Sequence, residues 1–162
     1  MQDTRLPEKT LLLGWREWVG LPDLGLPQIK AKVDTGARTS TLHAFQLRTY
    51  TEAGQLKVEF QIHPKQKDLD LVQICTANVI GEKVVSDSGG HKEQRLVIVT
   101  PLVLGAYSWP IEITLTSRDN MLFRMLLGRT AIDGLAVVDP SKSYLVGKRP
   151  RKIKQPKSDA SQ

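Results

Sequence analysis

Apolar and polar residues alternate along much of this chain, which is typical of β-strands that bury one face. The clearest case is 29–33, where Ile29, Ala31 and Val33 alternate with Lys30 and Lys32. Segments of similar character predict further strands at 11–20, 39–42, 45–50, 56–62, 72–80, 95–100, 108–116, 121–127, 136–139 and 143–146.

Glycine and proline mark the connections between these strands. Two prolines and a glycine in 21–27 predict a turn and exclude a helix, and 52–54 predicts a hairpin turn. The small polar segment 84–91 predicts a mobile tip. Only 128–134 is helical in character, and Gly134 closes it. Many short strands with one short helix predict an all-β fold, either a barrel or a sandwich.

The chain of 162 residues predicts one domain with a substantial core. We expect residues 1–10 to be flexible, 11–147 to fold, and 148–162 to be a disordered tail. That tail holds six basic residues and one acidic residue, which account for five of the six net positive charges. It is interpreted as a solvated tail, with a weak contact to RNA or a contact to an acidic partner as the alternatives.

Asp34 ends the clearest strand and is followed by Thr35 and Gly36. Another β-favouring segment begins at Thr39, so the sequence predicts one carboxylate on a tight turn between two strands. Strands fix a side chain better than a free loop does, and this placement suits a catalytic acid.

Cysteine usage and hydropathy indicate the compartment. Cys75 is the single cysteine, so no internal disulfide can form, and its apolar surroundings predict a buried thiol. The apolar run 11–13 is too short for a signal peptide, and no stretch approaches the ~18 apolar residues of a membrane span. We therefore expect a soluble, cytoplasmic protein with no membrane partner.

The sequence predicts no cofactor. The three histidines, His43, His63 and His91, are scattered, without the paired spacing of a zinc-binding helix. A zinc site assembled from His43, Cys75 and carboxylates remains an alternative. No glycine-rich phosphate-binding loop is present, so ATP binding is not expected.

A second signal follows later in the chain, where Leu126, Leu127, Gly128 and Arg129 precede the predicted helix. Together with 33–37, and in this order, it resembles the retropepsin-type aspartic peptidases. The resemblance implies a closed barrel in which Asp34, Thr35 and Gly36 form the catalytic turn. It also implies that Leu126, Leu127 and Gly128 pack beside that turn and support it.

The resemblance narrows to the RimB-like group, a bacterial family also named "ATP-dependent zinc protease". It covers about 11–147 and is carried by 14–18, 21–22, 30–40, 42–44, 125–129 and 138–140. Its members often accompany RimK, a ligase that adds glutamates to a ribosomal protein. The resemblance implies an aspartic endopeptidase that cleaves or trims an acidic, glutamate-rich tail.

An aspartic mechanism needs two carboxylates that share a proton. This chain has one Asp-Thr-Gly, and Asp133 and Asp139 lack comparable surroundings. The hypothesis therefore predicts a homodimer in which two copies of Asp34 meet on a two-fold axis. Thr35 would lock the two turns together, and Gly36 would leave space for substrate and offer its amide to the carboxylate.

Basic residues near the turn suggest an acidic substrate. Alternation places Lys30 and Lys32 on the same strand face as Asp34, although a solvated strand face is the alternative. Further substrate contacts are expected from the two motif segments and from the polar tip, which would act as a flap: Ala37, Arg38, Arg129, Ser88 and Gly89.

Two other functions remain open. The chain could be a non-catalytic binding module for a RimK-type ligase or a ribosomal protein, or a zinc-dependent peptidase. Glu17, which lies between two tryptophans, is expected to form a structural ion pair with Arg16, Arg38 or Arg129.

Overall fold

The computed structural model describes residues 3–65, 68–87, 89–117 and 122–147. Within them lie eleven β-strands, one short α-helix and one 3-10 turn. The elements are β1 (Leu11–Leu13), β2 (Arg16–Leu21), η1 (Pro22–Leu24), β3 (Leu26–Asp34), β4 (Ser40–His43), β5 (Phe45–Glu52), β6 (Gln55–Ile62), β7 (Gln73–Ser86), β8 (Lys92–Leu104), β9 (Tyr107–Thr116), β10 (Met125–Gly128), α1 (Arg129–Ile132) and β11 (Ala136–Val138). The all-β prediction with one short helix is confirmed. The predicted tail, 148–162, lies outside the described residues.

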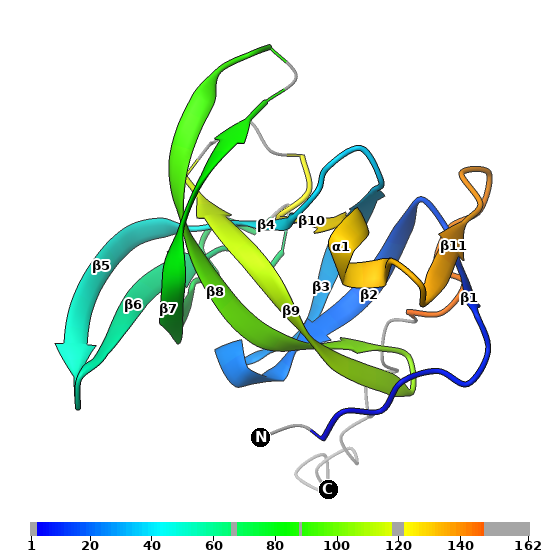
Figure 1. Ribbon diagram of the computed structural model, residues 1–162, viewed down its shortest axis with the longest axis horizontal. Helices are drawn as coiled ribbons and strands as arrows, with labels where there is room; N and C mark the ends of the chain where they lie inside the picture. The colour runs from blue at the N-terminus through cyan, green and yellow to red at the C-terminus, as the bar shows by residue number, and fades with distance from the viewer. Residues whose placement is uncertain (1–2, 66–67, 88, 118–121, 148–162) are drawn as a thin grey trace, which may run out of the picture.

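Six strands form a ring in the order β2-β3-β10-β4-β9-β8, and a single pairing of Gly20 with Val103 joins β8 back to β2. The predicted retropepsin-like closed arrangement is confirmed in this form. The sheet continues from β8 through β7 and β6 to β5, on one side of the ring (Figure 1). Separately, β1 and β11 pair in parallel.

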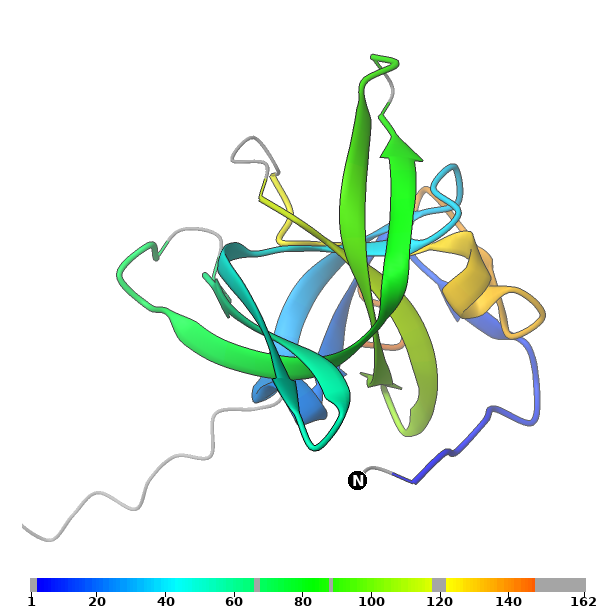
Figure 2. The same cartoon turned by 60° about the vertical axis from the view of Figure 1, so that its left-hand side comes forward.

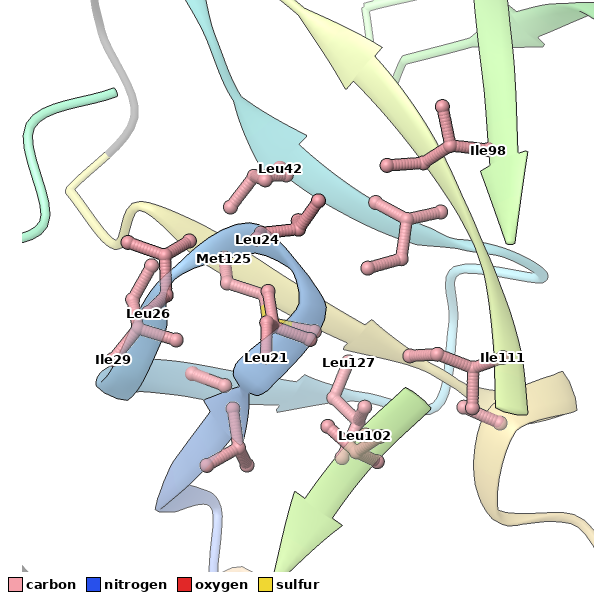
Figure 3. Packing of buried hydrophobic residues seen from close by; sticks show 14 of the residues in the cluster. Leu21, Leu24, Leu26, Ile29, Leu42, Ile98, Leu102, Ile111, Met125 and Leu127 are labelled. Atoms are coloured by element: carbon pink, nitrogen blue, oxygen red, sulfur yellow. The ribbon is translucent and has the colours of Figure 1, made fainter. Parts of the chain in front are cut away.

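The core lies inside this ring. Ile29, Ala31 and Val33 of β3 are buried whereas Lys32 is exposed, which is the alternation that the sequence predicts. Figure 3 shows apolar side chains from the turn η1 and from several ring strands pointing toward one another. Leu102 and Leu127 are fully buried, and each such leucine stabilises the fold by about 1.5–3 kcal/mol.

Strand β10 is inserted between β3, to which it is parallel, and β4, to which it is antiparallel. Its last residue, Gly128, pairs in register with Asp34 and donates its N–H to Ser40 Oγ at 3.0 Å. A Cβ atom on Gly128 would lie 2.5 Å from the carbonyl carbon of Thr39. Only glycine therefore permits this approach of two backbones, and the approach fixes where β3 ends.

A buried carboxylate ties the end of the described chain to β2. Glu17 is 0% exposed, and its two oxygens accept N–H hydrogen bonds from Gly14, Leu145, Val146 and Gly147 at 2.7–3.0 Å. The expected ion pair to an arginine is wrong, because within the described residues these backbone amides surround the carboxylate. The expectation that Glu17 has a structural role is consistent with this arrangement.

Several predicted boundaries differ from the structure. The predicted strand 11–20 is two strands, because Trp15 donates its N–H to the Lys142 carbonyl and leaves the ladder there. The predicted turn 21–27 contains a 3-10 turn, which tolerates Pro22 at its first position. Residues 143–146 form no strand, because amides in this segment bond to Glu17 instead of to a neighbouring strand.

The ends of two predicted elements also need correction. Strands β7 and β8 extend to Ser86 and from Lys92, so the connecting tip is only 87–91. Near the predicted flexible start of the chain, Arg5 exchanges two backbone hydrogen bonds with Ser108.

Replacing Gly128 with alanine is expected to lower the free energy of unfolding by about 3 kcal/mol, because the new methyl group overlaps backbone that cannot move aside. Gly54→Ala is the control. Gly54 has a φ of +79° but open space around its Cβ position, so only the conformational cost of about 1 kcal/mol applies. Chemical denaturation of both variants measures the difference, and equal losses would contradict the backbone-contact explanation.

Glu17→Gln is expected to cost about 2–4 kcal/mol of unfolding free energy, because the amide group of glutamine directs N–H donors at backbone N–H donors. The matched control is Glu52→Gln, since the Glu52 side chain is 63% exposed and 3.8 Å from the Lys57 ammonium. An exposed pair of this kind contributes less than about 1 kcal/mol. Thermal unfolding compares the two, and a neutral Glu17→Gln would show that the four hydrogen bonds contribute little.

Candidate active site

A groove of about 960 Å³ lies where the β3–β4 loop faces the β7–β8 hairpin. Figure 2 shows this hairpin standing above the sheet on the same side as the loop that follows β3. The groove is lined by Asp34, Gly36, Ala37, Arg38, Thr39, Thr41, Lys83, Val84, Val85, Ser86, Asp87, Arg95, Leu126 and Arg129.

Asp34 is the last residue of β3, and its side chain is half-buried. Its Oδ1 atom accepts the N–H groups of Gly36 at 3.1 Å and Ala37 at 3.2 Å. No described residue donates a hydrogen bond to Oδ2, so this oxygen is available for a reactant. The amide contact that the sequence suggested for Gly36 is therefore present.

The importance of Gly36 lies in its lack of a side chain and not in an unusual backbone conformation. It does not adopt a positive φ, but a Cβ there would lie 3.3 Å from Asp34 Oδ1. A side chain would crowd the oxygen that the turn holds. Thr35 is exposed and is not part of the groove lining.

The start of α1 fixes the loop after Asp34. Arg129 donates its backbone N–H to the Ala37 carbonyl at 2.9 Å, and its Nη1 contacts the Gly36 carbonyl at 3.4 Å. Thr130 donates both its N–H, at 3.1 Å, and its hydroxyl, at 2.8 Å, to the Arg38 carbonyl. The two sequence motifs thus meet, and the second restrains the first.

The β7–β8 hairpin supplies the opposite side of the groove through 83–87. At its tip, Asp87 Oδ1 accepts the N–H of His91 at 2.8 Å, and Oδ2 lies 3.4 Å from His91 Nδ1. Of the two tip residues expected to contact substrate, Ser88 lies outside the described residues and Gly89 is exposed but does not line the groove.

Cations outnumber carboxylates in the groove lining. Arg38, Lys83, Arg95 and Arg129 line it beside Asp34 and Asp87. Lys83 Nζ lies 2.7 Å from a Glu112 oxygen, which offsets part of its charge. The lining therefore attracts anions.

Lys30 and Lys32 do not line the groove, contrary to expectation. The groove begins at the end of β3, and a residue two positions back lies about 6.6 Å away along the strand. Lys30 Nζ lies 5.2 Å from the Trp18 ring centroid, across the β2–β3 pair. These lysines share the strand face of Asp34 but not its surroundings.

Sequence reasoning missed Lys83 and Arg95, which pair in register across β7 and β8. Arg95 is 7% exposed although it is charged. The sequence did hold a signal for Arg95, which is a charged residue at an inward position of an otherwise apolar strand. A charged side chain is buried only where hydrogen-bond or ion-pair partners surround it.

The other acids of the chain lie elsewhere. Asp133 and Asp139 do not line the groove. Asp139 Oδ1 accepts the N–H and hydroxyl of Ser141, which lowers the pKa of the Asp139 carboxyl. Among the described residues that line the groove, Asp34 and Asp87 are the only carboxylates, and Asp87 is engaged by His91.

The described residues contain no group of three histidine, cysteine, aspartate or glutamate side chains placed to hold a metal ion. Burial raises the pKa of the Cys75 thiol to about 12, which disfavours the thiolate that a metal requires. His43 is buried in β4. The described part of the chain also has no helix of the length and apolarity needed to span a membrane.

Similar proteins agree with this fold. The crystal structure of Lpg0085, a protein with unknown function (DUF785) from Legionella pneumophila, has a TM-score of 0.71 and 26% identity to this chain. The likeness covers 85% of this chain and 98% of that one.

Curated relatives carry a different kind of name. A "Probable alpha-L-glutamate ligase" of Shewanella halifaxensis is 40% identical over 144 residues, 89% of this chain and 31% of that protein. A protein of the same name from Parasynechococcus marenigrum is 45% identical over 139 residues, 86% and 30% of the two chains. The chain thus spans less than a third of the length of these relatives.

Residues 12–149 match the family model described as "Retropepsin-like aspartic endopeptidase RimB". The match includes both motif segments and every strand of the ring. The chain therefore belongs to the RimB-like family.

Proposed function

We propose that this protein is an aspartic endopeptidase that acts as a homodimer on acidic, glutamate-rich peptide segments. The observation that carries the proposal is Asp34 itself. Two backbone amides hold one of its oxygens, while the other has no donor among the described residues and the side chain lines the groove. The family described as a retropepsin-like aspartic endopeptidase supports the same chemistry.

The reaction needs two copies of Asp34. One carboxylate takes a proton from water as the hydroxyl oxygen bonds to the scissile carbonyl carbon, and the protonated partner gives its proton to the carbonyl oxygen. The C–N bond then breaks as the amine nitrogen gains a proton from one carboxyl group, while a proton from the intermediate returns to the other. The pair titrates as a unit.

A two-fold axis beside the Asp-Thr-Gly turn would supply the second acid. Thr35 is exposed in the single chain, so its hydroxyl is available to a second copy. The groove of one chain holds one Asp34, and a symmetric partner would add the other. The β7–β8 hairpin, which faces the turn across the groove, would act as the flap.

The acidic substrate is supported by the lining charges, since Arg38, Arg129 and two further cations line the groove together with Asp34. The names of the curated relatives refer to glutamate ligation, and a chain of added glutamates is an acidic peptide. Proximity of this domain to ligase chemistry in those longer proteins is consistent with a shared substrate.

A second candidate function is a binding module that partners a glutamate ligase or a ribosomal protein. The observation that favours it is that the matched relatives are about three times longer than the match and are named ligases. This alternative leaves the positioned carboxylate of Asp34 without a role, so we place it second.

Asp34→Asn is expected to lower kcat/KM on a glutamate-tailed protein by at least about 10³-fold, because an amide can neither accept nor donate the transferred proton. The fold should be unchanged by circular dichroism. Asp87→Asn is the matched control, since it removes the other groove carboxylate and should cost far less.

Retained cleavage by Asp34→Asn would reject the aspartic mechanism. Treatment with a metal chelator distinguishes the aspartic peptidase from the zinc-dependent alternative. A zinc-dependent enzyme would lose activity, whereas an aspartic enzyme would keep it. If neither the wild type nor Asp34→Asn cleaves the substrate and both bind a glutamate ligase, the binding-module function would be favoured.

Mixing wild type with an excess of Asp34→Asn is expected to inhibit the wild-type chains, because most of them would then sit in dimers with one functional carboxylate. Activity should fall as the share of wild-type homodimers falls. Sedimentation of the same mixtures reports whether dimers form. Activity proportional to the wild-type concentration alone would contradict the shared site.

A further inference from the structure

Arg95 is a buried cation on the wall of the groove. It lies on β8 and is 7% exposed, yet it is one of the residues that line the groove beside Asp34. Keeping a charged guanidinium so far from water is costly unless its N–H groups are bonded. The hydrogen-bond partner of each N–H group therefore indicates the role of the side chain.

Three of the five N–H groups of Arg95 are occupied by side chains, one from β8 itself and two from β4 and β9. Nε donates to a Glu93 oxygen at 3.1 Å. Nη1 donates to the hydroxyl oxygens of Thr41, at 3.2 Å, and Thr114, at 3.4 Å. These threonines pair in register on β4 and β9, and their hydroxyls lie 3.1 Å apart.

The remaining two N–H groups, both on Nη2, have no acceptor among the residues that the structure describes. Since Nε and Nη1 are directed at Glu93 and the threonines, Nη2 is the nitrogen left for the groove that Arg95 lines. A guanidinium is planar, so fixing two of its nitrogens also fixes the direction of the third. The side chain is held ready for an acceptor that no described residue supplies.

Glu93 offsets part of the charge of Arg95 without filling this position. Its carboxylate also accepts the Thr116 hydroxyl at 3.0 and 3.1 Å, and its side chain is 29% exposed. Lys83, the cross-strand neighbour of Arg95, adds a second cation on the same wall. The favoured acceptor is therefore an anion, bound with the strength of a single charge-assisted hydrogen bond.

We propose that Arg95 is a specificity-determining residue, whose Nη2 binds a carboxylate of the substrate beside the scissile bond. The inference rests on the proposed function, since it assigns a contact within the same groove. The carboxylate could belong to a glutamate or aspartate side chain or to the C-terminus of a peptide, and both present the same chemistry to a guanidinium.

The test uses a peptide series in which a single glutamate or glutamine is moved through each position around the cleaved bond. Wild type is expected to favour glutamate about tenfold in kcat/KM at one position, the size of one charge-assisted hydrogen bond. Arg95→Lys should bring that ratio close to one, because lysine keeps the charge but loses the fixed planar group. The change should appear mainly in KM.

Arg48→Lys is the matched control, because Arg48 Nη2 also contacts a carboxylate, that of Glu59 at 3.4 Å, but lies outside the groove lining. It should leave the ratio unchanged. If Arg95→Lys folds poorly, the double variant Arg95→Met with Glu93→Gln removes both charges and leaves neither unpaired. It should lose the glutamate preference as well.

Peptides with a free or an amidated C-terminus distinguish the two sources of the carboxylate. A preference that depends on Arg95 supports the proposal whether it follows the side chain or the C-terminus. An unaltered ratio in Arg95→Lys, or equal treatment of glutamate and glutamine by wild type, would overturn it.

Binding of the same fluorescent peptides to Asp34→Asn separates this inference from the proposed function. If wild type cleaves no peptide, the peptidase proposal fails, and the glutamate preference in binding still measures the role of Arg95. If the peptides are cleaved but Arg95→Lys keeps the preference, only the assignment of Arg95 fails. Peptides that neither bind nor are cleaved overturn both.

Discussion

The contact between two backbones at Gly128 is the constraint on which the site depends. Because Gly128 has no side chain, β10 can lie against Thr39 and Ser40 while it pairs with the end of β3. That insertion sets the direction in which the chain leaves Asp34, and the first residues of α1 then bond to the same loop. The position of the candidate acid is thus decided by a steric condition almost 100 residues further along the chain, and not by the turn alone.

The groove combines the carboxylates of Asp34 and Asp87 with four cations, so its lining favours anionic ligands. Arg38 and Arg129 come from the two segments that hold Asp34, so the cations are fixed by the same framework as the acid. A single chain provides one Asp34 and one wall of basic residues. A symmetric second copy would double both, which would place two acids within a basic channel suited to an extended anionic peptide.

The sequence predicted the parts of the fold that local pattern controls. Alternation located most strands. The two motifs located Asp34 as the candidate acid and Ala37, Arg38 and Arg129 as substrate contacts. All four of these residues line the groove. It misplaced Lys30 and Lys32, because alternation reports the face of a strand and not where along that strand a groove begins. It did not identify Lys83 or Arg95, since their proximity to Asp34 depends on strands far apart in sequence. The partners of Glu17 escaped prediction for a related reason, because backbone amides have no signature in a sequence.

Glu17 gives the end of the described chain a mechanical role. The Glu17 carboxylate and the Trp18 backbone form hydrogen bonds with 145–147. A Cβ on Gly147 would overlap the Trp18 carbonyl. Tension applied at 145–147 would therefore act on β2, which is itself a ring strand, and would meet several hydrogen bonds within three residues. A load on 145–147 would thus be carried by the ring through β2, and these residues act as an anchor point.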